Sequence, residues 1–369
     1  MKKIGLDLRV LTGRNYSGIP RYAYNVAKEL NSFQNEDYLF IGEFQSLEVP
    51  ETKRLYLDLP ASDSDLANKL LAFKGEAAKL DLLFSPYYPL PSKRLFKGVQ
   101  VIHDLIPLKF PELCGNSTAT YDFFNKGIRV SAQYCDHIIA DSYATKGDII
   151  DFFDIDESKI SVVHLAPLIV NHALKNSINQ SVLDQYGIKG PYILSVCTIE
   201  PRKNLRRVLK AYEILRQRHK EKLHMVLVGG LGWKYQELLK EITTNQYHED
   251  IIMTGFVPDE DLGVLYKNAQ AFVYASIYEG FGLPVLEAMA LGAPVVTSQT
   301  SSLPEVAGNA AIYCDPLDIE SIAFAMEQMI ISPQIQQQYI REGLKRASAF
   351  SWKRTAEETR RIFLMCLES

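Results

Sequence analysis

Short apolar runs alternate along the chain with longer stretches that have helical spacing. The runs in the first part are KIGLDL, YLFIGE, RLYLDL, DLLFSP, VQVIHDL, HIIADS and ISVVHL, and those in the second are PYILSVCT, HMVLVGG, IIMTGF, AFVYAS, APVVTS and AAIYCD. Helical patterns such as IPRYAYNVAKEL lie between several of them. Because apolar strands that alternate with helices form parallel sheets covered on both faces, the pattern predicts an α/β protein with doubly wound sheets.

The pattern also predicts how the chain divides. A length of 369 residues suits two domains at roughly 150 residues per domain. Residues 171–190 are polar and show no clear strand, so we place the boundary there. We expect Rossmann-like domains at 1–172 and 173–345, followed by a helical segment at 346–369 with Ser351 as its N-cap.

Composition excludes several classes of protein. The net charge is -4 and neither half is basic, which gives a nucleic-acid partner no electrostatic support. The five cysteines are scattered without a Cys-x-x-Cys pair, which argues against a disulfide framework and a zinc site. No apolar run approaches the roughly 18 residues of a membrane span, and the start is too short for a signal peptide. We expect a cytoplasmic protein.

A peripheral contact with the inner face of the membrane remains compatible with this expectation. Lys93, Arg94 and Lys97 flank Leu95 and Phe96, a mixture of cations and apolar side chains that suits a membrane surface. The same stretch is equally typical of a solvated turn.

Two carboxylates stand out in the stretch SIYEGFGLPVLEAMALGAPVV. Pro284 and Gly292 bound a predicted helix of about two turns. Glu287 lies in this helix among apolar neighbours, and Glu279 lies upstream in a glycine-flanked loop. A buried carboxylate is costly without a partner, and ligand hydroxyl groups would supply one. The alternative is that Glu287 pairs with a core arginine and Glu279 is solvated.

A second candidate is SVCTIEPRKNLRRVLKAYEIL, where we predict a helix that starts near Pro201. Arg202 and Lys203 would lie in its first turn, although the helix dipole disfavours cations there. They suit an anion such as a diphosphate. The alternative is a solvated basic turn with Glu200 as a partner.

Two further candidates lie in the first domain. His103 ends the apolar run of VIHDL, where it would face a sugar or carry a proton, or else be structural. Gly18 opens the first helix in SGIPRY, a position that suits a phosphate but is common in this fold class.

Two other patterns are rejected. GGLGW lacks the third glycine of a dinucleotide fingerprint because Tyr235 occupies that position. The Asp-x-Asp triplets at 63–65, 154–156 and 259–261 are better interpreted as turn or helix-start acids than as metal ligands. We therefore expect neither a metal site nor a bound cofactor.

Taken together, these motifs resemble glycosyltransferase family 4, the large retaining group with the GT-B fold. The resemblance spans nearly the full chain. It rests on two glutamates with seven residues between them, Glu279 and Glu287, together with SGIPRY, HD, EPRKN and SSLPEVAGNAAIYCDP at their places along the chain. Many members have a Gly-Gly pair where this chain has Ser17 and Gly18, which weakens the assignment of the first loop. SGIPRY and EPRKN resemble bacterial O-antigen and lipopolysaccharide mannosyltransferases.

The resemblance implies roles for these residues. Glu279 would contact hydroxyls of the transferred sugar, with Phe281, Gly282 and Leu283 beside it offering backbone contacts to the donor. Glu287 would hold the ribose of the nucleotide.

The resemblance also assigns the cations and the first domain. Arg202 and Lys203 would bind the donor diphosphate and support the leaving group. His103 would lie near the sugar, Gly18 would approach donor phosphate and acceptor, and the last helix would return to the first domain.

The sequence therefore predicts a retaining, metal-independent hexosyltransferase in bacterial surface polysaccharide synthesis. The favoured donor is GDP-mannose, and the acceptor is a glycan or lipid-linked saccharide. Lys203 is expected to matter for turnover and little for folding. Alternatives are a UDP- or dTDP-sugar donor, a sugar-nucleotide 2-epimerase, and a non-catalytic nucleotide-sugar binding protein.

Overall fold

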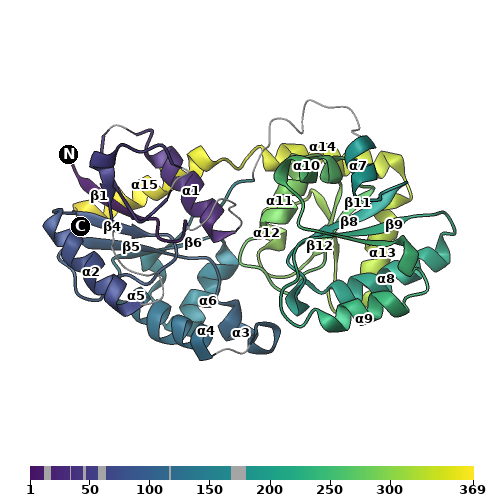
Figure 1. Cartoon of the computed structure of the whole chain (residues 1–369), viewed down its shortest axis with the longest axis horizontal. Coiled ribbons are helices and arrows are strands. Elements are labelled where there is room, and N and C mark those ends of the chain that lie inside the picture. Colours follow the sequence, from purple (N-terminus) through teal and green to yellow (C-terminus); the bar gives the residue numbers. More distant parts are fainter. Residues whose placement is uncertain (12–17, 34, 45–46, 57–63, 116–117, 168–179) are drawn as a thin grey trace. The chain divides into compact units, whose positions relative to one another are not determined.

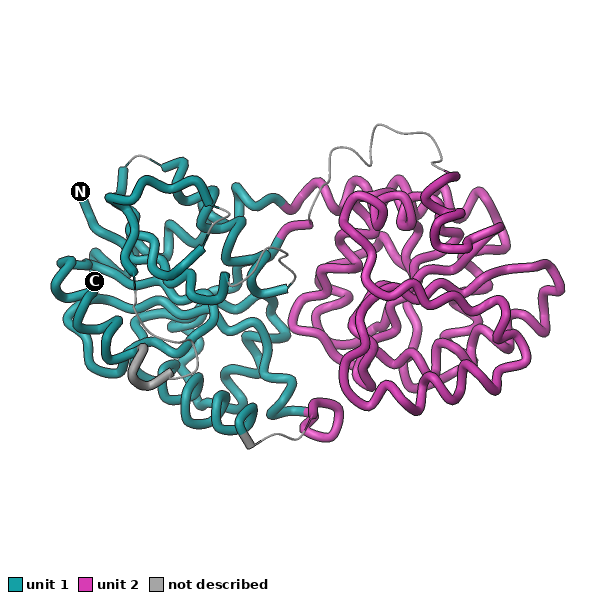
Figure 2. The backbone as a smooth tube through the Cα atoms, in the orientation of Figure 1, with its two compact units in different colours: residues 1–109, 116–165, 351–369 teal, residues 110–115, 166–350 magenta. Residues whose placement is uncertain are grey.

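The computed structural model describes residues 1–11, 18–33, 35–44, 47–56, 64–115, 118–167 and 180–369 (Figure 1). The chain divides into two compact units, shown in different colours in Figure 2. Unit 1 consists of residues 1–109, 116–165 and 351–369, and unit 2 consists of residues 110–115 and 166–350. The predicted boundary between residues 172 and 173 lies outside the described residues.

A parallel sheet forms the centre of unit 1. Within the described ranges it has seven strands in the order β3-β2-β1-β4-β5-β6-β7, and every pair of neighbours is parallel. The strands are β1 (Lys3–Asp7), β2 (Asp37–Ile41), β3 (Arg54–Leu55), β4 (Leu82–Ser85), β5 (Lys97–Ile102), β6 (His137–Ala140) and β7 (Ile160–Val162). The strands β4 and β6 are buried along their whole length because helices cover both faces of the sheet.

Helices flank this sheet above and below in Figure 1. They are α1 (Ile19–Leu30), α2 (Ser64–Ala77), α3 (Ile106–Lys109), α4 (Thr118–Asp122), α5 (Arg129–Tyr134), α6 (Tyr143–Phe153) and α15 (Trp352–Glu368). Between α4 and α5 the helix continues as a π-helical segment, η3 (Phe123–Ile128), and short 3-10 turns lie at η1 (Glu51–Lys53) and η4 (Glu157–Lys159).

Unit 2 repeats the arrangement with a parallel sheet that has six strands in the described ranges, in the order β10-β9-β8-β11-β12-β13. The strands are β8 (Tyr192–Val196), β9 (His224–Val228), β10 (Ile251–Gly255), β11 (Ala271–Tyr274), β12 (Val295–Ser298) and β13 (Ala311–Cys314). The sheet order reverses direction at β8 and β11, where doubly wound folds place their ligands at the carboxyl ends of the strands.

Helices cover both faces of this sheet as well (Figure 1). They are α7 (Gln180–Gln185), α8 (Leu205–Arg218), α9 (Gln236–Thr244), α10 (Asp259–Asn268), α11 (Leu283–Ala290), α12 (Leu303–Ala307), α13 (Ile319–Ile330) and α14 (Pro333–Ala347), with 3-10 turns at η2 (Pro111–Leu113), η5 (Pro201–Lys203) and η6 (His248–Asp250). Two such sheets confirm the predicted α/β fold class.

The predicted two-turn helix is α11. Pro284 lies in its first turn, and Gly292 follows its end with φ +79°, a left-handed conformation that glycine adopts without strain. The helix is buried almost all round, which explains why its sequence is apolar on every face. Its first residues come directly out of the loop that carries Glu279, so the helix fixes where that loop ends.

The last helix, α15, belongs to unit 1. As predicted, Ser351 caps it by accepting a hydrogen bond from the Arg354 amide. The buried ring of Phe363 packs on Phe84 of β4, with ring centroids 5.2 Å apart. Arg360 donates to the carboxylate of Glu36. These contacts tie the C-terminus to the sheet of the first unit.

Candidate active site

Glu279 is the centre of a buried polar cluster in unit 2. It lies in the loop that joins β11 to α11, and its side chain is 9% exposed. One carboxylate oxygen, Oε1, accepts hydrogen bonds from Lys203 Nζ at 2.7 Å, Tyr274 OH at 2.9 Å and Ser276 Oγ at 2.5 Å. The other oxygen accepts from Arg202 Nη1 at 2.6 Å. The buried carboxylate is thus paired with two cations.

The two cations hold Glu279 in its charged form. Burial acts to raise the pKa of Glu279, but the charges of Arg202 and Lys203 and the hydrogen bonds from Lys203 and Ser276 lower it to about 2. At neutral pH the carboxylate is therefore an anion that accepts hydrogen bonds. Hydroxyl groups of a sugar are suitable donors to it.

Arg202 and Lys203 come from the η5 turn after β8. Arg202 also donates to Glu200 Oε1 at 2.6 Å and to the carbonyl oxygen of Tyr278 at 3.0 Å. Lys203 Nζ donates to Tyr274 OH at 2.7 Å. The alternative interpretation of this stretch was a solvated turn in which Glu200 neutralises one cation, and Glu200 does pair with Arg202. The turn is nevertheless not solvated, since the side chains of Arg202 and Lys203 are 16% and 10% exposed and reach the carboxylate of Glu279.

The prediction that a helix starts near Pro201 is wrong. Pro201–Lys203 form a 3-10 turn, and α8 begins only at Leu205. Asn204 separates them with φ +61°, and its side-chain amide donates to the carbonyl oxygens of Ala275 and Pro316 at 2.9 and 2.6 Å. These bonds to distant loops hold a left-handed residue in place, so the two cations precede the helix.

Several residues of the cluster were given no individual role in the sequence analysis. Tyr274 and Ser276 donate to Glu279, and Ser301 accepts a hydrogen bond from the Glu279 amide at 3.0 Å. Ser302 donates to the carbonyl oxygens of Glu279 and Phe281. Only their position at the carboxyl ends of β11 and β12 could have pointed to them.

Glu287 lies in the second turn of α11 and is 9% exposed. Phe281, Gly282 and Leu283 connect it to Glu279, and Gly282 has φ +108°. A Cβ atom at Gly282 would lie 2.7 Å from Leu303 Cδ2, so this position favours glycine for conformational and for steric reasons. The structure thus brings Glu279, Arg202 and Lys203 together in unit 2 and places Glu287 in the helix that follows the same loop.

His103 and Gly18 lie in unit 1. His103 follows β5, and its ring nitrogen Nδ1 lies 2.6 Å from Asp141 Oδ2 while Nε2 lies 2.8 Å from the carbonyl oxygen of Pro86. A carbonyl oxygen only accepts, so Nε2 carries a proton. Burial acts to lower the pKa of His103, but the charge of Asp141 and the bond to it raise the pKa overall. Either nitrogen would have to give up one of these bonds to exchange a proton with another molecule.

Gly18 is exposed and precedes α1 with φ +57°. The residues before it, including Ser17 of the SGIPRY motif, lie outside the described ranges. Its predicted contact with phosphate or acceptor stays a prediction.

The described residues contain no group of three or more His, Cys, Asp and Glu side chains placed to hold a metal ion. No described helix has the length and apolar character needed to cross a membrane. Of the Asp-x-Asp triplets, Asp156 caps η4 and Asp259 and Asp261 lie in the first turn of α10, which are the turn and helix-start positions expected for them.

Solved structures show the fold first. The structure resembles sucrose-phosphate synthase from Thermosynechococcus elongatus with a TM-score of 0.77 at 16% identity, covering 99% of each chain. It also resembles WaaG, a glycosyltransferase involved in lipopolysaccharide biosynthesis, with a TM-score of 0.71 at 12% identity, covering 98% of this chain and 99% of that one. These likenesses concern the fold alone, and they confirm the predicted GT-B fold.

Sequence comparison then gives the family. The family described as glycosyl transferases group 1 matches residues 183–346. The O-antigen chain mannosyltransferase B of Escherichia coli is 31% identical over 93% of this chain and 94% of its own length. The serotype-specific mannosyltransferase WbdA of Escherichia coli is 31% identical over 74% of this chain, which spans 34% of that longer protein. The chain belongs to the group 1 glycosyltransferases and is a glycosyltransferase, as the family resemblance predicted.

Proposed function

We propose that the enzyme transfers mannose from GDP-mannose to a glycan or lipid-linked saccharide in O-antigen synthesis, with retention of configuration and without a metal ion. The names of the relatives from Escherichia coli and of the O-antigen chain mannosyltransferase RfbU of Salmonella typhimurium, 28% identical over 62% of this chain and 59% of its own length, support mannose and O-antigen. They also favour a transferase over a 2-epimerase or a non-catalytic binding protein.

The arrangement of Arg202, Lys203 and Glu279 carries the proposal. An ammonium group has three N–H donors, and Lys203 uses two of them on Tyr274 and Glu279. The third remains for an oxygen of a diphosphate. Arg202 lies beside Lys203 on the same carboxylate, so a diphosphate bound there would be close to both cations.

The same arrangement suggests how the leaving group is stabilised. When the bond between the sugar and the diphosphate breaks, negative charge grows on the diphosphate and positive charge on the sugar ring. Fixed cations near the diphosphate stabilise this separation most when they need not reorient. Lys203 and Arg202 are held in place by Glu279, Glu200 and Tyr274, so they meet this condition and support a transfer that needs no metal ion.

Glu279 and Glu287 would position the donor. The charged Glu279 carboxylate would accept hydrogen bonds from hydroxyls of the hexose, with Phe281, Gly282 and Leu283 forming the adjoining backbone. Glu287, in the helix that follows, would accept from the ribose hydroxyls. The roles of His103 near the sugar and of Gly18 near the phosphate remain predictions for unit 1.

The first test is a thermal-shift panel with GDP, UDP, dTDP and ADP and their sugar conjugates, in the presence of EDTA. A ligand that binds only the folded protein raises the melting temperature by mass action. We expect GDP and GDP-mannose to give the largest shift. A larger shift with UDP or dTDP ligands would overturn the mannose donor, and no shift with any nucleotide would overturn the assignment of the donor site.

The second test follows the reaction itself. With a mannan oligosaccharide as acceptor, we expect GDP release from GDP-mannose in EDTA and an α-linked product by NMR. A β-linked product would contradict retention, since the donor is α-linked. Dependence of the rate on added Mg²⁺ or Mn²⁺ would contradict metal independence.

A further inference from the structure

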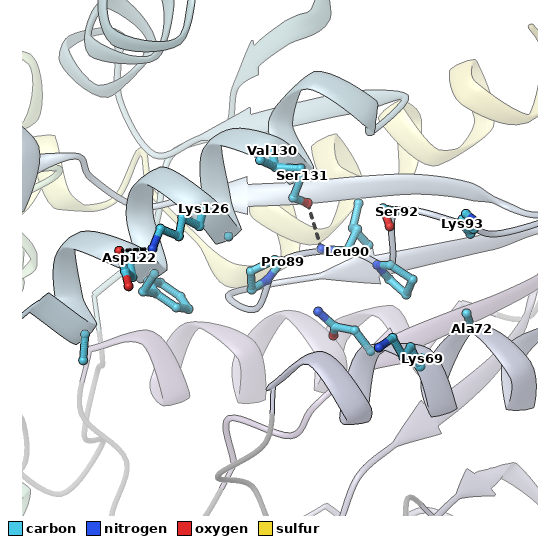
Figure 3. A pocket seen from close by; sticks show the side chains of 15 residues that line it. Lys69, Ala72, Pro89, Leu90, Ser92, Lys93, Asp122, Lys126, Val130 and Ser131 are labelled. Carbon is cyan, nitrogen blue, oxygen red and sulfur yellow. Dashed lines mark hydrogen bonds and ion pairs between the residues drawn. The ribbon is translucent and has the colours of Figure 1, made fainter.

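A pocket of about 760 Å³ lies on unit 1, and none of the residues assigned to the donor lines it (Figure 3). It is formed by α2, by the loop between β4 and β5, and by the continuous helical stretch of α4, η3 and α5. Its volume is within the range of ligand pockets, roughly 300–1,000 Å³. The π-helical segment η3 contributes to its wall, and such segments are frequent at functional sites.

Lysines outnumber carboxylates among the described residues that line the pocket. Lys69, Lys93 and Lys126 line it, while Asp122 is the one carboxylate among its described lining residues. Lys126 Nζ lies 3.0 Å from Asp122 Oδ1, a pair visible as a dashed line in Figure 3. Lys93 is exposed on the loop between β4 and β5. An anionic ligand would complement this charge.

Apolar side chains form much of the remaining wall, beside the polar Asn68, Ser92 and Ser131. Pro89, Leu90 and Pro91 form one side, and Phe123 and Val130 face from the helical stretch. These side chains can cover apolar parts of a ligand, but they offer it no hydrogen bonds.

The helices that form the pocket also carry exposed large apolar side chains. Phe73 follows the lining residue Ala72 on α2 and is 69% exposed, and Tyr134 lies one turn beyond Val130 and is 61% exposed. Exposed large apolar side chains that adjoin an apolar pocket are typical of a binding surface.

The polar groups of the pocket are largely used within the protein. Ser131 Oγ accepts from the Leu90 amide at 2.8 Å and donates to Gln100 Oε1 at 2.5 Å, and Asp122 pairs with Lys126. A bare saccharide needs many hydrogen-bond partners, which this pocket supplies poorly. A ligand with an apolar chain and an anionic head group fits it better.

The stretch suggested from sequence as a membrane contact is mostly structural. Arg94 donates to Asp136 Oδ2 at 3.0 Å, Lys97 lies 3.4 Å from the other oxygen of the same carboxylate, and Phe96 is buried. Lys93 and Leu95 remain exposed. Of the three cations in this stretch, only Lys93 lines the pocket.

We propose that this pocket binds the lipid phosphate part of a lipid-linked saccharide acceptor, with the apolar chain along Leu90, Phe123 and Val130 and the phosphate beside Lys69 and Lys93. The inference rests on the proposed function, because it names the part of the acceptor that anchors in unit 1. Phosphate groups pair with lysine as a point charge, and the chain is held by apolar burial.

Farnesyl diphosphate is a suitable probe because it joins an apolar chain to a diphosphate. Its binding is measured by calorimetry on the full chain with saturating GDP, so that the donor site is occupied. We expect it to bind about tenfold or more tightly than either farnesol or inorganic pyrophosphate. Equal binding of pyrophosphate would mean an anion site only, equal binding of farnesol would mean an apolar site only, and either result would overturn the proposal.

Two variants and a control locate the site. Lys93→Glu removes a cation of the pocket, and Val130→Glu places a charge on its apolar wall. Each variant is expected to weaken the binding of farnesyl diphosphate by about tenfold. Lys28→Glu on α1 changes an exposed lysine outside the pocket and is expected to leave binding unchanged. Equal effects of all three variants, or none, would overturn the site.

Measurements on the same variants distinguish a failure of this proposal from a failure of the proposed donor site. GDP binding, measured alone by thermal shift, depends on unit 2 and is expected to be the same in all variants. Loss of farnesyl diphosphate binding with normal GDP binding supports the pocket. Binding of farnesyl diphosphate without any GDP binding would support the proposed ligand of the pocket and would overturn the assignment of the donor site. Binding to anionic phospholipid vesicles without affinity for farnesyl diphosphate would overturn the pocket in favour of a membrane surface.

Discussion

Lys203 connects folding and catalysis at a single side chain. Its ammonium group bonds Tyr274 and the buried carboxylate of Glu279. We expect Lys203→Ala to lower kcat by about 100-fold or more, because a fixed cation near the leaving diphosphate is lost. It should also destabilise unit 2, since breaking a buried ion pair leaves a charge less compensated. The expectation from sequence that Lys203 matters little for folding is thereby revised.

Steady-state kinetics with GDP-mannose and chemical unfolding test both effects of Lys203→Ala. Lys210→Ala is the matched control, because Lys210 is an exposed lysine on α8 of the same unit. It should change neither quantity appreciably. An unchanged kcat in Lys203→Ala would argue against a role in leaving-group stabilisation.

Glu279 should make the stability of unit 2 depend on pH. Its pKa in the folded protein is about 2, against an ordinary value of 4.5. The ionised carboxylate therefore stabilises the fold above pH 4.5, and this contribution is lost as pH falls towards 2. The shift corresponds to about 3 kcal/mol, as an upper estimate for a group coupled to two cations.

Glu279→Gln keeps the shape of the side chain and removes its charge. The difference in unfolding free energy between the native protein and Glu279→Gln should be largest at pH 7 and should shrink as the pH falls below 4.5. Trp352→Phe in both proteins leaves Trp233 as the sole tryptophan, so fluorescence then reports on unit 2. A constant difference across this pH range would refute the assigned pKa.

The sequence identified the charged residues of the cluster but not their mutual contacts. Glu279 stood out because it lies in a glycine-flanked loop, and Arg202 and Lys203 because their charge opposes a helix dipole. That they bind one another could not be predicted, because 76 residues separate Lys203 from Glu279 along the chain. Tyr274 and Ser276 have no local pattern at all, since their roles arise only from where β11 ends.

At the scale of elements, the start of α11 depends on Gly282. Alanine there would have to adopt φ +108°, and its Cβ would meet Leu303 Cδ2 at 2.7 Å. We expect Gly282→Ala to cost about 1–3 kcal/mol in strain. It should also weaken GDP-mannose binding, because the loop between Glu279 and Glu287 shifts. Calorimetric titration and thermal unfolding measure the two effects.

Gly292→Ala is the matched control for the start of α11. Gly292 also has a positive φ, +79°, but it follows the other end of the helix, and the nearest side-chain atom to its Cβ would be 3.9 Å away. The Gly292→Ala variant should lose stability through backbone strain and keep its affinity for GDP-mannose. Similar losses of affinity in both variants would show that helix stability, rather than the loop, governs binding.

Element boundaries show where local patterns fail. Pro284 and Gly292 are local signals, and they placed α11 correctly. Pro201 is the same kind of signal, yet α8 starts at Leu205 because Asn204 is held in a left-handed conformation by carbonyl oxygens of Ala275 and Pro316. Propensity and periodicity contain no information on such distant partners, so tertiary contacts decided this boundary.

For the whole molecule, the alternation of apolar strands and helices was enough to predict two parallel sheets. This alternation did not indicate that the last helix returns to the first domain. That prediction came from the family resemblance. In the structure the chain completes unit 2 at residue 350 and then contributes α15 to unit 1. The stability of unit 1 therefore depends on the last 19 residues of the chain, 351–369, although the rest of the unit lies within the first 165.

Phe363→Ala tests this dependence in the full-length chain. Phe363 is fully buried and packs on Phe84, so its truncation should cost unit 1 about 3–5 kcal/mol. Hydrogen exchange should show faster opening in β4 and α1, with unit 2 peptides and the thermal shift by GDP unchanged. Phe324→Ala on α13, where the ring is exposed, is the control and should leave both units unaffected. Loss of protection in unit 2 instead would mean that α15 stabilises the other unit.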